Sequence, residues 1–182
     1  MNYIIPLKYF PGLAGIILLA ACTSNTTEKT MSPAYFSLKT YFEQEAIRLN
    51  QQHLPVLKTV SINGIMETKK INDIDFKKEL ASFADADINK SSWKGAFRVE
   101  KKDNLTLYYT NNTKIPVKRL EIYSSGKRVK GIRIIRSDTN ILYRSADTLV
   151  YKADSLYEIR KVEKVKLLSP ATYGIKGEFL HP

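Results

Sequence analysis

Apolar residues recur at intervals of three and four through residues 33–52, a spacing typical of one face of a helix. Ser32 followed by Pro33 favours a helix start, because the hydroxyl can cap and proline suits the first helical position. The apolar face of the predicted helix consists of Tyr35, Leu38, Phe42, Ala46 and Leu49. Its polar face is mixed in sign, so we expect it to pack on a sheet rather than lie in a membrane interface.

Two strand-like runs flank Asn63-Gly64 within residues 56–71. This dipeptide supplies the two positive-φ residues of a type I′ turn, so a β-hairpin is predicted. The two-residue turn fixes the register and places Ile62 opposite Ile65 and Val60 opposite Glu67.

A second helix is predicted from Asn72 to about Ala86. Asn72 can cap it, and the carboxylates of Asp73 and Asp75 suit its positive end. Its apolar stripe consists of Phe76, Leu80, Phe83 and Ala84.

From Trp93 onward the apolar period changes to two, which is typical of strands. Polar turn residues separate the runs, and short loops between consecutive strands imply an antiparallel meander of roughly seven to nine strands, including the hairpin. The predicted runs after the second helix are 93–99, 105–109, 117–123, 129–136, 141–143, 148–151, 156–168 and 173–179.

Some of these strands carry apolar side chains on both faces. Leu120 and Ile122 lie on the opposite face of their strand from Tyr123, and Ile134 lies on the opposite face from Ile135. Two helices can cover one face of such a sheet, and the other face then needs a closing barrel, a partner or an apolar ligand. The predicted fold class is α+β, with two helices on a long antiparallel meander that forms a curved sheet or half-barrel. This layout resembles the half-barrel of lipoprotein-localisation carriers and other periplasmic lipid-binding lipoproteins, in architecture only, so no functional residues carry over.

The first residues form a separate segment with one charge, Lys8, and an apolar stretch from Phe10 to Ala21. That stretch is too short for a membrane span of about 20 apolar residues, but it suits the core of a secretory signal peptide. It ends in Leu19-Ala20-Ala21-Cys22, which resembles the lipobox of bacterial lipoprotein precursors. The resemblance implies cleavage between Ala21 and Cys22 and a lipid on the thiol of Cys22.

Three segments are therefore predicted: a signal peptide over 1–21, a lipidated cysteine with a flexible polar tether over 22–32, and a single α+β domain over 33–182. Thr23, rather than an aspartate, follows the cysteine. By resemblance to enterobacterial lipoproteins this favours the outer membrane. The tether carries no acidic run of the kind that directs export to the cell surface, so we expect the domain to face the periplasm.

The chain has 29 Lys and Arg against 18 Asp and Glu, a net charge of +11. Such a charge favours anionic partners, and for a lipid-anchored protein these are lipid headgroups rather than nucleic acid. Basic residues crowd two strand pairs and form a candidate anion-binding face. Its members are Lys127, Arg128, Lys130, Arg133, Lys164 and Lys166. The alternative is that these cations solvate the sheet and protect it from aggregation.

No catalytic motif is present, and we predict a protein that is not an enzyme and needs no metal or cofactor. The only histidines are His53 and His181, a weak basis for a metal site. The carboxylates of Glu79, Asp85 and Asp87 are more typical of helix ends and turns.

Two short sequences match a bacterial O-glycosylation pattern of an aspartate, a hydroxyl residue and an apolar residue. They are Asp147-Thr148-Leu149 and Asp154-Ser155-Leu156.

Two functions fit these observations. The first is a non-catalytic binding module for a lipid or other amphiphile in the concavity between sheet and helices. The alternative is a structural or assembly lipoprotein that binds another cell-envelope protein through its sheet.

Overall fold

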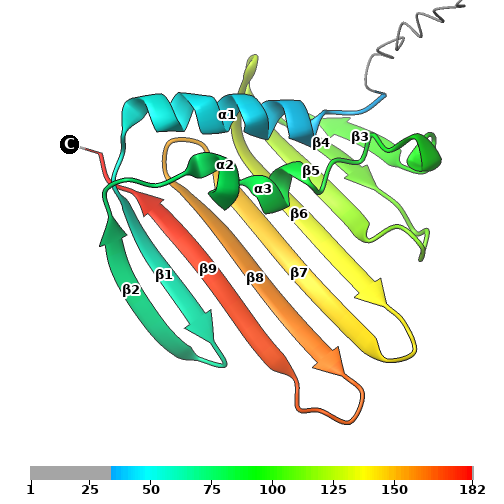
Figure 1. Cartoon of the computed structure of the whole chain (residues 1–182). Helices are drawn as coiled ribbons and strands as arrows, with labels where there is room; N and C mark the ends of the chain where they lie inside the picture. The colour runs from blue at the N-terminus through cyan, green and yellow to red at the C-terminus, as the bar shows by residue number, and fades with distance from the viewer. Residues whose placement is uncertain (1–33, 182) are drawn as a thin grey trace, which may run out of the picture. The chain divides into compact units, whose positions relative to one another are not determined.

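A computed structural model describes residues 34–181, so the lipobox, the tether and the predicted Ser32-Pro33 cap lie outside the described residues. Residues 34–181 form three α-helices, one short 3₁₀ helix and nine strands (Figure 1). The helices are α1 (Leu38–Gln52), α2 (Phe76–Glu79), α3 (Ala81–Ala84) and η1 (Ser91–Trp93). The strands are β1 (Val56–Ile62), β2 (Ile65–Ile71), β3 (Arg98–Lys102), β4 (Leu105–Tyr109), β5 (Val117–Ser125), β6 (Arg128–Thr139), β7 (Tyr143–Lys152), β8 (Leu156–Val165) and β9 (Ala171–Phe179).

All nine strands belong to one open antiparallel sheet in the order β2-β1-β9-β8-β7-β6-β5-β4-β3. The predicted α+β class and the curved meander are confirmed. Strands β3 to β9 follow one another as hairpins, and β1 joins the sheet by pairing with β9.

The predicted hairpin is correct in its register, with Ile62 paired to Ile65 and Val60 paired to Glu67. Asn63 and Gly64 have φ values of 50° and 87°, as a type I′ turn requires.

Helix α1 begins at Leu38, five residues later than predicted, because the cap is Ser37. The Ser37 Oγ accepts a hydrogen bond from the Thr40 N–H at 3.2 Å. Asp87, distant in the sequence, also fixes the start of α1. Its Oδ2 accepts hydrogen bonds from the Ser37 hydroxyl at 2.9 Å and from the Lys39 N–H at 2.8 Å.

The predicted second helix is instead two short helices, of which α2 is capped by Asp75 rather than Asn72 and α3 has no side-chain cap. Leu80 separates them, because its ψ of 2° leaves the helical range. The predicted apolar stripe still packs inward, with Phe76, Leu80 and Phe83 buried.

Several predicted strand boundaries are wrong. Residues 93–97 form the end of η1 and a loop, and β3 starts at Arg98. Strand β6 runs on to Thr139, Ile141 and Leu142 lie in the turn that follows, and Tyr143 and the predicted run 148–151 are parts of one strand, β7. Strand β8 ends at Val165, so Leu167 and Leu168 lie in a loop.

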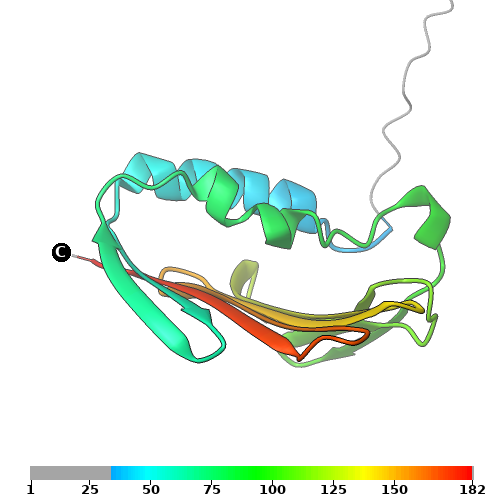
Figure 2. The ribbon, with the colours of Figure 1, turned by 60° about the horizontal axis from the view of Figure 1, so that its bottom comes forward.

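The helices lie along the concave face of the sheet (Figure 2). One core forms between them, and its largest buried side chains include Phe42, Phe83, Tyr151 and Tyr157. Among residues 34–181 no element covers the convex face, which carries Tyr123, Ile135 and Val150 on strands whose other face is buried. Within that same range, no helix has both the length and the apolar content needed to cross a membrane.

Candidate ligand-binding site on the concave face of the sheet

The concave face divides into two halves along its strands. Helix α1 crosses the strands near one end of the sheet, and the strands continue well beyond α2 and α3 (Figure 1). The covered half lies beneath the helices, and the open half is the part of the concave face beyond them.

In the covered half, one polar network, buried only at Glu45 and Tyr151, ties α1 to the sheet. Glu45 on α1 accepts a hydrogen bond from the Tyr151 hydroxyl of β7. Arg48 pairs with Glu45 at 2.6 Å and with Asp154 at 2.8 Å, and Arg128 also pairs with Asp154. Burial, reinforced by the bond to Glu45, raises the pKa of Tyr151, which therefore remains a neutral donor.

A second polar contact marks the margin of the covered half. Glu79 at the end of α2 receives both a 2.7 Å ion pair from Lys58 of β1 and a 2.6 Å hydrogen bond from the Tyr157 hydroxyl of β8. These two contacts fix the position of α2 over β1 and β8. On β1, β8 and β9, the side chains beyond this contact belong to the open half.

A continuous apolar row crosses the sheet just past this margin, from β5 to β1. Cross-strand pairing aligns Leu120, Ile134, Leu149, Ile159, Ile175 and Val60. Exposure increases along the row, from 0% at Leu120 to 38% at Val60. The β1 end of the row is therefore an apolar surface open to solvent.

The exposed end of this row continues into the next one, since Ile62 of β1 pairs with Tyr173 of β9. We define the apolar strip as the neighbouring side chains that share this part of the concave face. They are Val60, Ile62, Ile159, Tyr173 and Ile175. A contiguous exposed apolar surface marks a binding site more often than a single exposed apolar side chain does.

A polar row adjoins the apolar strip, because Lys161 of β8 pairs with Tyr173 on one side and with Asp147 of β7 on the other. Arg136 of β6 pairs in turn with Asp147. We call Arg136, Asp147 and Lys161 the polar row. It places charged groups directly beside apolar ones on one sheet face.

Asp147 is the unusual member, because its side chain faces the core side of β7 and the residue is only 7% exposed. Its Oδ2 lies 3.3 Å from an Arg136 guanidinium nitrogen. Its Oδ1 is the one buried side-chain oxygen or nitrogen among residues 34–181 without a hydrogen-bond partner. Burial raises the pKa of this carboxyl, although the charges of Arg136 and Lys161 oppose the shift.

Lys161 makes no hydrogen bond to this oxygen, and its ammonium pairs with Glu163 on the same strand. A buried carboxylate oxygen without a donor costs free energy, which a ligand N–H or O–H group can recover. The open half therefore combines an apolar surface with an acceptor that lacks its donor.

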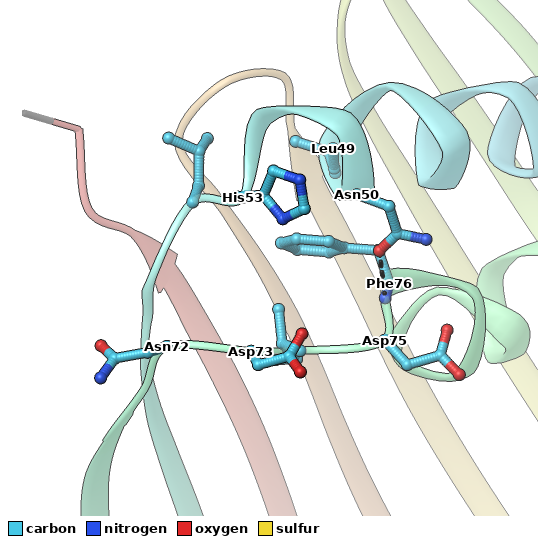
Figure 3. Close-up of a pocket in the computed structure, with 9 residues that line it drawn as sticks. Leu49, Asn50, His53, Asn72, Asp73, Asp75 and Phe76 are labelled. Carbon is cyan, nitrogen blue, oxygen red and sulfur yellow. Dashed lines mark hydrogen bonds between the residues drawn. The ribbon is translucent and has the colours of Figure 1, made fainter.

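Apart from this surface, a hollow of about 350 Å³ lies where α1 ends and the chain enters α2 (Figure 3). Leu49, His53 and Phe76 line it, and Asn50 Oδ1 accepts a hydrogen bond from the Phe76 N–H at 3.1 Å. His53 ends α1 in the left-handed conformation. These polar groups join the end of α1 to the start of α2, so we assign the hollow a role in the fold.

The six predicted anion-binding residues do not form one patch. Lys127 and Arg128 lie at the turn between β5 and β6, beside α1, where both line a hollow of about 530 Å³. Lys164 and Lys166 lie at the other end of the sheet and line a hollow of about 420 Å³. Arg133 pairs with Glu121 across the convex face, and Lys130 lies at a register shift between β5 and β6.

The other candidate residues from the sequence have contacts that stabilise the fold. Asp87 caps the start of α1, and Glu79 binds Lys58 and Tyr157. The His181 ring lies 2.6 Å from the Asp154 carbonyl oxygen. In the part of the chain that the structure describes, no His, Cys, Asp and Glu side chains cluster as metal ligands.

The two glycosylation patterns differ in their setting. Thr148 is half-buried within β7, beside the paired carboxylate of Asp147. Ser155 is exposed in the turn between β7 and β8.

Comparisons of this chain with protein families, with curated proteins and with solved structures found no match. The site therefore has to be interpreted from its own chemistry.

Sequence reasoning missed the polar row, although one signal for it was present. Asp147 stands two residues before Leu149 and four before Tyr151, at the positions of β7 that face the core. A carboxylate at such a position is expensive to bury and indicates either an ion pair or a ligand.

Proposed function

We propose that this protein is a lipid-anchored, periplasm-facing lipoprotein that binds a lipid or other amphiphile without catalysis. The apolar part of the ligand lies on the apolar strip, and its head group meets the polar row. The observation that carries the proposal is the adjacency of these two surfaces, joined by the pairing of Tyr173 with Lys161.

The geometry suits an amphiphile better than a wholly apolar or wholly polar ligand. The apolar strip offers burial worth about 25 cal/mol for each Å² of apolar surface removed from water. The polar row would make that burial unfavourable for a chain without a head group. The Asp147 oxygen is buried and lacks a donor, so it favours a head group whose N–H or O–H donors reach it once the side chains over it move.

Native mass spectrometry of residues 23–182 tests this proposal with two lysophospholipids whose head groups differ in N–H donors. Lysophosphatidylethanolamine carries a primary ammonium with N–H groups, and the trimethylated ammonium of lysophosphatidylcholine has none, while both keep the glycerol hydroxyl. We expect the first to bind and the second to bind several-fold more weakly. Equal binding of both would exclude donation from the head-group ammonium to Asp147, and no binding of either would exclude the proposal.

Matched variants locate the site. Val60→Ser with Tyr173→Ser alters exposed residues of the apolar strip, and we expect it to weaken lysophosphatidylethanolamine binding about tenfold. Val162→Ser is the control, because Val162 is also exposed and lies on the same sheet but on its convex face. An equal loss in both variants would argue against a site on the concave face.

The lipid anchor is tested separately by Cys22→Ser in cells. We expect the variant to remain unprocessed at Ala21 and to carry no lipid on residue 22. A variant that is still cleaved after Ala21 and still recovered with the membrane would exclude the lipobox.

The alternative, an assembly lipoprotein, is favoured by a different observation. Strand β2 is an unpaired edge of the sheet, and its residues are exposed from Ile65 to Lys70. Charged edges resist pairing, but Ile65 and Met66 leave the first part of β2 without a charge. A protein recovered with the full-length lipoprotein at fixed stoichiometry, and lost on Met66→Lys, would support this function over amphiphile binding.

A further inference from the structure

The most exposed apolar side chains of the domain gather in loops at one end of the sheet. Leu167 in the β8–β9 loop is 97% exposed, and Ile141 in the β6–β7 turn is 89% exposed. Ile65, which begins β2, is 81% exposed. We define the apolar edge as these exposed residues at the start of β2 and in the two loops: Ile65, Met66, Ile141, Leu142, Leu167 and Leu168.

Hydrogen bonds hold the three connections side by side. The N–H of Asn63, in the β1–β2 turn, donates to the Thr172 carbonyl at 2.9 Å. The Thr172 N–H donates in return to Asn63 Oδ1 at 2.8 Å. The Lys166 N–H donates to the Leu142 carbonyl at 2.8 Å, which ties the β6–β7 turn to the β8–β9 loop. In Figure 1 these connections lie at the end of the sheet opposite α1.

Leu167 adopts a φ of 71°, in the left-handed region that glycine and asparagine tolerate best. A left-handed backbone conformation disfavours leucine, and so does the nearly complete exposure of its side chain to water. Folding alone therefore gives no reason for an apolar side chain at this tip.

Cations lie directly beside the apolar edge. Arg144, Lys164 and Lys166 line a hollow of about 420 Å³ together with residues 140–143. None of the acidic residues within 34–181 lines that hollow. The edge is thus apolar at its tips and positive just behind them.

We propose that the apolar edge docks into an anionic phospholipid bilayer, with its tips among the acyl chains and Arg144, Lys164 and Lys166 at the lipid phosphates. A bilayer accepts separate inserted side chains, and its surface charge complements these cations. A second copy of the chain fits poorly, because a symmetric contact would bring the two sets of cations together. This membrane contact goes beyond the proposed function and does not depend on the apolar strip or on Cys22.

Sedimentation of residues 23–182 with vesicles tests the proposal. The core residues all lie between Leu38 and Phe179, so this part contains the whole folded unit. We expect binding to vesicles of phosphatidylcholine with phosphatidylglycerol, weaker binding to phosphatidylcholine alone, and loss of that difference at high salt. Equal binding to the two vesicles, or none to either at low salt, would overturn the proposal.

Two pairs of substitutions separate the apolar and charged contributions. Leu167→Ser with Leu168→Ser should weaken binding to both vesicles about tenfold or more, and Lys164→Gln with Lys166→Gln should weaken mainly the binding that depends on phosphatidylglycerol. The matched controls are Ile47→Ser, on the exposed side of α1, and Lys127→Gln, at the opposite end of the sheet. Controls that lose as much binding as the test variants would contradict the assignment.

A direct readout of insertion comes from Leu167→Trp. With brominated phospholipid, we expect quenching of the new tryptophan beyond that of Trp93, the only tryptophan of the wild type. Absence of that quenching in the bound protein would overturn insertion. A dimer that Leu167→Ser with Leu168→Ser abolishes, without vesicle binding in the wild type, would assign the apolar edge to self-association instead.

The experiment also separates the two proposals. Val60→Ser with Tyr173→Ser should leave vesicle binding unchanged while weakening lysophospholipid binding. Leu167→Ser with Leu168→Ser should do the reverse.

Discussion

The covered and open halves of the concave face are built from the same strands, yet their side chains are satisfied in different ways. Beneath the helices, Tyr151 and Tyr157 are fully buried, and both hydroxyls reach carboxylates on helices. Beyond the helices, Val60 and Tyr173 remain exposed, and the buried Asp147 oxygen has no donor. In the covered half the large side chains are therefore buried and hydrogen-bonded. In the open half, apolar side chains remain in contact with water and one buried oxygen lacks a hydrogen bond.

This difference separates stability from binding. A substitution in the covered half should change the free energy of unfolding, and one in the open half should change ligand binding with little effect on unfolding.

The largest effect is expected for Phe42→Ala in the covered half. Phe42 is 1% exposed and packs against Phe83 and Tyr151, with ring centroids 5.0 and 5.2 Å away. Truncation should cost about 3–5 kcal/mol in the free energy of unfolding, measured by urea denaturation. Ile47→Ala on the same helix is the control and should cost within about 0.5 kcal/mol. Equal costs would contradict the division of the helix into buried and exposed faces.

Tyr151→Phe tests the polar network of the covered half. The Glu45 carboxylate keeps its pair with Arg48, so removal of the hydroxyl should cost about 1–2 kcal/mol in unfolding free energy. The comparable change in the open half is Tyr173→Phe, which should be nearly neutral. If Tyr151→Phe were also neutral, the bond to Glu45 would contribute nothing to stability.

Asp147→Asn should change how stability depends on pH. Because burial raises the pKa of Asp147 in the folded protein, its ionised form disfavours folding. The contribution of Asp147 is therefore most favourable below the unfolded pKa of about 3.9 and is lost as pH rises through the folded pKa. The unfolding free energy of the wild type, relative to Asp147→Asn, should fall as the pH rises above about 4. A difference that rises with pH would contradict the assigned shift.

The smallest effect on stability is expected for Val60→Ser with Tyr173→Ser in the open half. Both side chains are more than one-third exposed, so the unfolding free energy should change by less than about 1 kcal/mol. Thermal unfolding of the double variant measures this change. A large loss of stability would show that the apolar strip is part of the core.

Local chemistry made some of the fold predictable. Asn63 and Gly64 by themselves favour a type I′ turn, and this two-residue turn fixes the register of β1 and β2. The start of α1 was not predictable in the same way, because Asp87, about fifty residues away in the chain, contacts both Ser37 and Lys39. A capping signal near Ser32 is local, whereas this partner appears only in the folded chain.

The candidate sites were harder to predict for a different reason. Leu167 and Leu168 extend the apolar pattern of β8, so the pattern predicts a longer strand instead of an exposed tip. The basic residues were predicted as one face, but strand direction separates Lys127 from Lys164 along the sheet. Sequence spacing gives the alternation of faces but not how far along a strand the helices cover it.

Photocrosslinking tests the proposed binding site most directly. A lysophosphatidylethanolamine with a diazirine in its acyl chain is bound to residues 23–182, irradiated and mapped by peptide mass spectrometry. We expect crosslinks on the apolar strip, in β1, β8 and β9, and far fewer in Val60→Ser with Tyr173→Ser. Crosslinks confined to the convex face, or unchanged in that variant, would contradict amphiphile binding by the open half of the sheet.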